Sequence, residues 1–102
     1  MLYDKRWEPK LPAETIEPWR QCLLDAADLL KREGWRTNSM GALGEPKCVL
    51  GAIRYSGHSN EVRIRAEEIF QHHVGMPLAE WNDCEVTFGW SVRRALRKAA
   101  RQ

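Results

Sequence analysis

Apolar residues recur every three to four positions in several separate stretches of the chain, which is the spacing of one-sided α-helices. The first stretch begins at Pro18, where a helix loses nothing through the missing N–H, and closes with Lys31 and Arg32. Gly34 follows and predicts a left-handed end to this helix. The face expected to be buried carries Trp19, Cys22, Leu23, Ala26, Ala27 and Leu30.

Residues 36–45 show neither a helical nor a strand period and are predicted to form a loop. A short second helix is expected to begin near Pro46 and to end at Ser56 and Gly57. Gly51 in its middle is a weak helix former, and together with the small neighbour Ala52 it indicates close approach of another helix. Its apolar positions are Cys48, Val49, Ala52, Ile53 and Tyr55.

Ser59 or Asn60 is predicted to cap a third helix that runs to about His72. Val62, Ala66, Ile69 and Phe70 are expected to face inward, and His73 is a further candidate for that face.

After the break at residues 74–77, one helical turn is expected to place Leu78 and Trp81 in the core and to end at Asn82 and Asp83. Thr87 is then predicted to cap a last helix. The apolar positions of that helix are Phe88, Val92, Ala95, Leu96 and Ala99.

These elements predict an all-α fold: a small compact domain of four main helices plus a short helical turn. A length of 102 residues suits one domain, which we place at 17–102 behind an extended N-terminal arm at 1–16. Tryptophan is abundant, with five residues, so we expect a tryptophan-rich core.

Composition narrows the function classes. The net charge of +2 does not by itself indicate a nucleic-acid partner. Cys22, Cys48 and Cys84 are odd in number and widely spaced, so they predict small buried side chains rather than a disulfide framework or a zinc ribbon. No apolar run is long enough for a signal peptide or a membrane span. We therefore expect a cytoplasmic protein without a membrane partner.

Several short runs resemble a family of small helical bacterial and phage proteins that is catalogued only as a domain of unknown function. The resemblance covers about residues 22–100 and is carried by 24–30 with Gly34 and Trp35, by 48–53 in a Cys-x-x-Gly-Ala pattern, and by 78–83 with Trp-Asn-Asp. It implies a helical fold and no activity. The longer N-terminal arm and the run 88–90 after Thr87 depart from the family pattern.

We interpret the residues that carry these motifs as structural. Asn82 and Asp83 are expected to satisfy the backbone of a non-helical link between the third helix and the last. The set assigned a structural role is Gly34, Trp35, Cys48, Gly51, Ala52, Trp81, Asn82, Asp83 and Thr87.

The strongest chemical signal is a run of five cations in the last helix: Arg93, Arg94, Arg97, Lys98 and Arg101. Such a face can neutralise phosphates or bind an acidic partner, and it can equally be a solvated face that complements the helix dipole. The turn at 56–58, followed by a third helix with Asn60 and Arg63 in its first turn, is a weaker indication of a helix-turn-helix.

Metal and catalytic signals are weaker still. Glu68 and His72 lie one helical turn apart, but His58, His72, His73, Asp83 and the cysteines match no recognised ligand spacing. Cys48 beside Lys47 is conceivable as a thiolate nucleophile. We predict no catalytic, cofactor-binding or metal-binding residue, and no cofactor.

The sequence thus favours a non-enzymatic accessory or regulatory protein that binds another protein, with homodimer formation left open, because tryptophan, tyrosine and arginine dominate protein interfaces. A nucleic-acid-binding regulator that uses the basic last helix is the alternative. A metal- or thiol-dependent enzyme is the third hypothesis.

Overall fold

The structure is a computed structural model that describes residues 16–42, 44–86 and 88–102. Its helices are α2 (Pro18–Glu33), α3 (Val49–Arg54), α4 (Asn60–Val74), α5 (Leu78–Glu80), the π-helical turn η1 (Trp81–Glu85) and α6 (Gly89–Ala100). The all-α fold predicted from the sequence is confirmed. The predicted arm at 1–16 lies outside the described residues except for Ile16.

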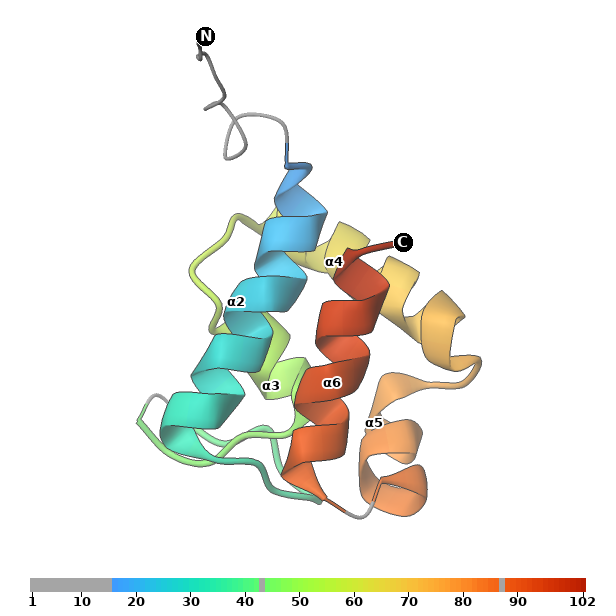
Figure 1. The fold of residues 1–102 in the computed structure, drawn as a ribbon. Coiled ribbons are helices and arrows are strands. Elements are labelled where there is room, and N and C mark those ends of the chain that lie inside the picture. Colours follow the sequence, from blue (N-terminus) through green and yellow to red (C-terminus); the bar gives the residue numbers. More distant parts are fainter. Residues whose placement is uncertain (1–15, 43, 87) are drawn as a thin grey trace, which may run out of the picture.

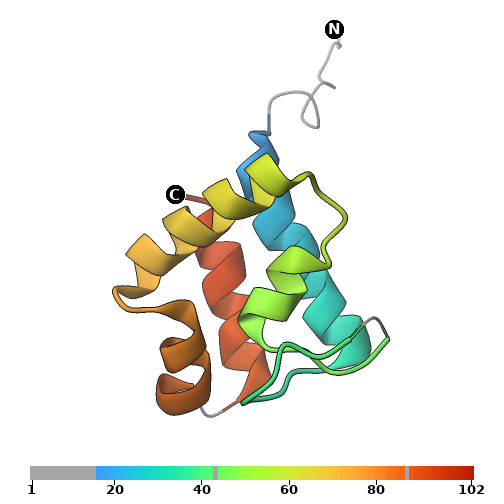
Figure 2. The ribbon, with the colours of Figure 1, turned by 180° about the vertical axis from the view of Figure 1, so that it is seen from behind.

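Helices α2 and α6 lie side by side and run in opposite directions, and this is the most extensive helix pair in the described chain (Figure 1). Helix α4 crosses the end of the pair where α2 begins and α6 finishes, as the view from behind also shows (Figure 2). Helix α3 packs against α2 and α4, while α5 bridges α3 and α4. The guanidinium of Arg20 donates to the carbonyl oxygen of Ala100 at 2.7 Å and ties the two ends together.

The core is built from aliphatic and small side chains with one phenylalanine. Alanines at several helix contacts allow the backbones to approach closely, and Phe70 fills the remaining space. The expected tryptophan-rich core is wrong for the described residues: Trp19, Trp35 and Trp81 are half-buried against the core, and Trp90 is 53% exposed. Indole rings are large and carry an N–H that needs a hydrogen-bond partner, which favours positions at the edge of the core.

Most helix ends follow the sequence. Pro18 opens α2, the Ser59 hydroxyl accepts from the Val62 N–H at the start of α4, and Gly75 ends α4 in the left-handed conformation. Gly34 differs from the prediction: its φ of 98° is positive, but its ψ of 163° is extended. The chain therefore leaves α2 straight into the bridge that pairs Trp35 with Lys47.

Helix α3 begins at Val49, later than predicted, because the Cys48 sulfur accepts from the Gly51 N–H and takes the cap position. Gly51 does serve a close approach, but the neighbour is a loop rather than a helix. A Cβ at Gly51 would lie 2.1 Å from the carbonyl oxygen of Met40. The glycine therefore lets the 36–45 loop lie directly on α3.

This contact predicts an inverted effect for Gly51→Ala. In a free helix the change stabilises by about 1 kcal/mol, whereas here we expect a loss of about 2 kcal/mol in the free energy of unfolding because backbone must move. Urea denaturation followed by circular dichroism measures it. A stabilised variant would contradict the close contact.

The junction before α6 also departs from the sequence prediction. The turn begun at Leu78 does not end at Asn82 and Asp83 but continues as η1 to Glu85. Thr87, predicted to cap α6, lies outside the described residues. The cap position belongs to Phe88, which forms no side-chain cap bond and is 55% exposed, so its predicted inward orientation is wrong.

Candidate binding surface

A buried amide connects three segments beneath the start of α6. The Asn82 side chain is fully buried, and its Oδ1 accepts from the Trp35 indole N–H at 2.7 Å and from the Val49 backbone N–H at 3.0 Å. Its Nδ2 donates to the Arg36 carbonyl oxygen at 3.1 Å and to Asp83 Oδ1 at 3.0 Å. We call these residues the Asn82 cluster. Every polar atom of the amide is used, which is what a buried amide requires.

Asp83 extends the cluster at the surface. Its carboxylate accepts from the Asn38 N–H at 3.0 Å, and this bond together with the Asn82 amide lowers the pKa of Asp83 below its usual range. Asn82 and Asp83 were expected to satisfy the link between the third helix and the last. Instead they bond to residues 35–38 and to the start of α3, which are distant in sequence.

The Asn82 cluster also positions the first turn of α6. A Cβ placed on Gly89 would lie 3.0 Å from Cβ of Trp35, so the helix begins in direct contact with this indole. Trp35 is in turn held by Asn82. The motif residues Trp35, Asn82 and Asp83 thus act together as a support for whatever α6 displays.

Lys47 is a second buried polar centre, which the sequence analysis placed only beside Cys48. Its side chain is fully buried, and its ammonium pairs with the Glu33 carboxylate and donates to the carbonyl oxygens of Ala42 at 2.7 Å and Glu45 at 2.8 Å. The bond from Lys47 lowers the pKa of Glu33. The ammonium is engaged by the loop that precedes α3, which leaves the suggested thiolate role of Cys48 without support.

Phe88 and Trp90 form an exposed aromatic pair at the start of α6. Their rings stack at a centroid distance of 6.1 Å and an interplanar angle of 12°. More than half of each side chain is open to solvent. Two large rings held parallel at the surface are unusual for a side-chain type that normally seeks burial, so the pair is a candidate contact site.

The predicted cations continue the same surface toward the C-terminus. Arg94, Lys98 and Arg101 are exposed, while Arg93 and Arg97 are half-buried. Trp90, Arg94 and Lys98 follow one another at four-residue spacing and therefore share a helix face. We call Phe88, Trp90, Arg94, Lys98 and Arg101 the aromatic–basic face.

Two features leave the charge of this face uncompensated. Helix α6 contains no acidic residue. Across residues 16–42, 44–86 and 88–102, none of the five cations lies within ion-pairing distance of a carboxylate. Exposed acidic side chains precede the aromatic pair in the sequence, at Glu80, Asp83 and Glu85, whereas the cations follow it from Arg93 onward.

A hollow of about 450 Å³ adjoins the aromatic–basic face, between α6, η1 and the end of α4. Trp81, Trp90 and Val74 line it together with Arg94 and Lys98. Its lining combines aromatic and apolar side chains with cations, so it is part of the same candidate surface.

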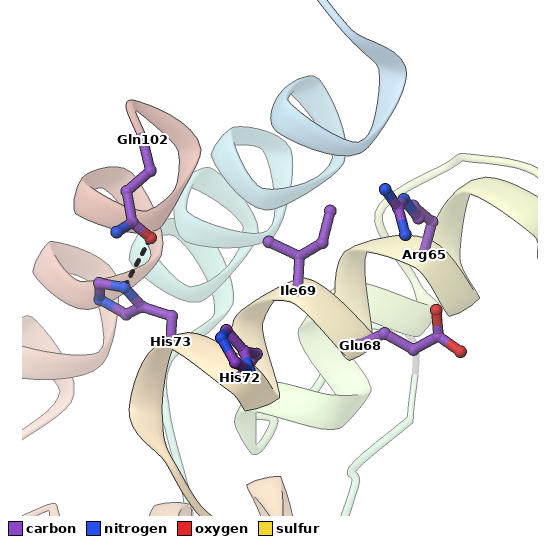
Figure 3. Close-up of a pocket in the computed structure, with 6 residues that line it drawn as sticks. All are labelled: Arg65, Glu68, Ile69, His72, His73 and Gln102. Carbon is purple, nitrogen blue, oxygen red and sulfur yellow. Dashed lines mark hydrogen bonds between the residues drawn. The ribbon is translucent and has the colours of Figure 1, made fainter.

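A second hollow of about 490 Å³ lies between α4 and the end of the chain (Figure 3). The His73 ring donates through Nδ1 to the Gln102 side-chain oxygen at 2.8 Å and stacks on Phe70, so this histidine is half-buried as part of the packing. His72 and Glu68 also project from α4, and the figure shows no interaction between their side chains. This hollow has mixed charge and offers no convergent set of groups.

The remaining candidates are engaged in internal contacts. His58 Nε2 donates to Asp25 Oδ2 at 2.7 Å, joining the α3–α4 turn to α2. The thiol of Cys22 lies 3.3 Å from the Ser56 hydroxyl, and burial raises its pKa. Cys22 and Cys48 are buried as predicted, whereas Cys84 is exposed, which corrects its predicted burial.

In residues 16–42, 44–86 and 88–102, His, Cys, Asp and Glu side chains nowhere form a group of three or more suited to a metal ion. Each helix there is too short or too polar to cross a membrane.

A family model described as "Family of unknown function (DUF6197)" matches residues 14–102. No curated protein and no solved structure matches the chain. The match spans every helix described above and brings no assigned activity with it.

Proposed function

The chain belongs to the DUF6197 family, whose function is unknown, and we propose that it is a non-enzymatic protein that binds nucleic acid through the aromatic–basic face of α6. The observation that carries the proposal is the exposed Phe88–Trp90 stack on the helix that also bears uncompensated cations. The three unpaired cysteines support action in the reducing cytoplasm.

A nucleic acid supplies both kinds of group that this face lacks. Its phosphates are regularly spaced anions, which exposed Arg94, Lys98 and Arg101 can neutralise with release of counterions. Its bases are flat rings, which stack on exposed aromatic side chains. This ranks nucleic acid above the protein partner that the sequence alone favours.

Binding to another protein remains the second candidate, because one observation favours it. The hollow beside Trp81 and Trp90 is lined by aromatic, apolar and cationic side chains, and such pockets receive the anchor side chains of protein partners. An acidic protein segment, or a second copy that offers Glu80 and Glu85, has the complementary charge.

The proposed function predicts salt-dependent binding that charge reversal on α6 weakens. We expect the Arg94→Glu/Lys98→Glu variant to bind a labelled oligonucleotide at least about tenfold more weakly than wild type, since it removes two cations and adds two anions along the phosphate path. Fluorescence anisotropy at 50 and 200 mM salt measures both the affinity and its salt slope.

Lys31→Glu/Arg32→Glu is the matched control. These two cations are exposed in the last turn of α2, so the pair changes the net charge equally and also opposes a helix dipole. We expect this control to keep most of the affinity. Equal weakening by both variants, or binding that does not depend on salt, would contradict the proposal. The second candidate, a protein partner, would then be tested with the same variants by sedimentation and affinity capture.

A further inference from the structure

We infer that the ligand of the aromatic–basic face is a single strand, DNA or RNA, bound without sequence specificity. The inference rests on the proposed function and narrows it to nucleic acid whose bases are unpaired. The Phe88–Trp90 stack carries it, because a duplex hides the faces of its bases inside the helix while a single strand can offer them.

The pair is a preorganised stacking site. Its two rings are already parallel within 12°, and each of the two residues is more than half exposed. The helix that bears them starts against Trp35, whose indole is bonded to Asn82. Little conformational freedom remains to be lost when a base stacks, so more of the stacking energy appears as affinity.

The cations mark the path of the strand away from the pair. Trp90, Arg94 and Lys98 rise by about 6 Å per step along one helix face, and Arg101 continues the series. The exposed carboxylates Asp83 and Glu85 of η1, which precede the aromatic pair in the sequence, repel phosphate. The strand therefore extends from the aromatic pair toward the end of α6.

The same face is poorly suited to read a duplex. A recognition helix in the major groove presents amide, hydroxyl and guanidinium groups from its first turns to base edges. The first turn of α6 presents Trp90 and the half-buried Ser91 instead, and the first exposed guanidinium, on Arg94, comes only in the second turn. Contacts are thus limited to stacking and phosphate neutralisation, which are tolerant of sequence.

Four labelled ligands of equal length test the inference: oligothymidine, oligouridine, a mixed-sequence DNA duplex and an abasic strand that keeps the phosphates without bases. We expect the first two to bind at least about tenfold more tightly than the abasic strand or the duplex, which is the range for one stacked base. Oligodeoxyuridine, which differs from oligouridine only by lacking the 2′-hydroxyl, is compared with it to identify the preferred sugar.

Variants at Trp90 test the stacking directly. Trp90→Leu should weaken binding of the two single strands by about tenfold and leave duplex binding unchanged. Trp90→Phe, which keeps an aromatic ring, should retain most of the wild-type affinity. Ile64→Ala is the matched control, since Ile64 is 56% exposed on α4. Circular dichroism confirms that each variant is folded.

The outcomes separate the two claims. Duplex or abasic binding as tight as single-strand binding, or an unchanged affinity in Trp90→Leu, overturns the single-strand inference while the proposed function stands. Absence of salt-dependent binding to all four ligands overturns both.

Discussion

Replacing Asn82 with alanine is expected to lower the free energy of unfolding by about 4 kcal/mol, because it leaves several polar groups without their partner. The Val49 N–H loses its acceptor within the core, the Trp35 indole N–H loses its acceptor at the edge of the core, and the Arg36 carbonyl oxygen loses its donor. Urea denaturation followed by circular dichroism and by tryptophan fluorescence measures the loss, and the two probes should report the same transition.

Two neighbouring variants show whether the buried amide itself is responsible. Asp83→Asn is expected to lower the free energy of unfolding by less than about 1 kcal/mol, because the position is exposed and the new amide still offers an oxygen to the Asn38 N–H. Asn82→Asp keeps the acceptor oxygen but places a second carboxylate where the amide nitrogen lay, 3.0 Å from Asp83 Oδ1. Because the two charges repel, this variant should lose most stability near neutral pH and regain part of it in acid. A loss below about 1 kcal/mol in Asn82→Ala would refute the supporting role of the cluster.

Lys47→Ala is the second large expected effect, a loss of about 3 kcal/mol. The substitution removes a fully buried stem, leaves Glu33 without its ion pair and frees the loop carbonyls of Ala42 and Glu45. Lys31→Ala, at an exposed position on α2, should change stability by less than about 0.5 kcal/mol. Thermal and urea unfolding of the two variants against wild type provide the comparison.

The pH dependence of the free energy of unfolding is an independent measure of the Lys47–Glu33 ion pair. Because the pKa of Glu33 is lowered in the folded protein, the pair stabilises above the usual glutamate range and its contribution disappears as the pH falls through and below about 4. The stability difference between wild type and Lys47→Ala should therefore shrink in acid. A difference that stays constant down to pH 2.5 would show that Lys47 acts through packing alone.

The helical framework was largely predictable because its signals are local. Pro18 and Ser59 begin helices at the expected places, and apolar positions such as Leu23, Ala66 and Leu96 are buried. Helix α3 and η1 were placed less well, since a thiol cap at Cys48 and a π-helical turn have no periodic signature. Periodicity reports which face is apolar rather than how a turn is closed.

The candidate site was only half predictable. The cations of α6 are evident as a run in the sequence, but Phe88 was assigned to the core because its spacing from Val92 fits a helix face. The structure begins α6 one residue later and turns that ring outward. Asn82 and Lys47 were missed as buried centres because their partners, Trp35 and Glu33, lie far along the chain.

The most direct test of the aromatic–basic face is a two-dimensional ¹H–¹⁵N NMR titration with oligothymidine, in which the five tryptophan indoles serve as separate reporters. The account predicts that the Trp90 indole and the backbone amides of α6 shift together. The Trp35 indole, bonded to Asn82, should stay in place. Shifts confined to other helices, or no shift at a saturating oligonucleotide concentration, would contradict a binding site on this face.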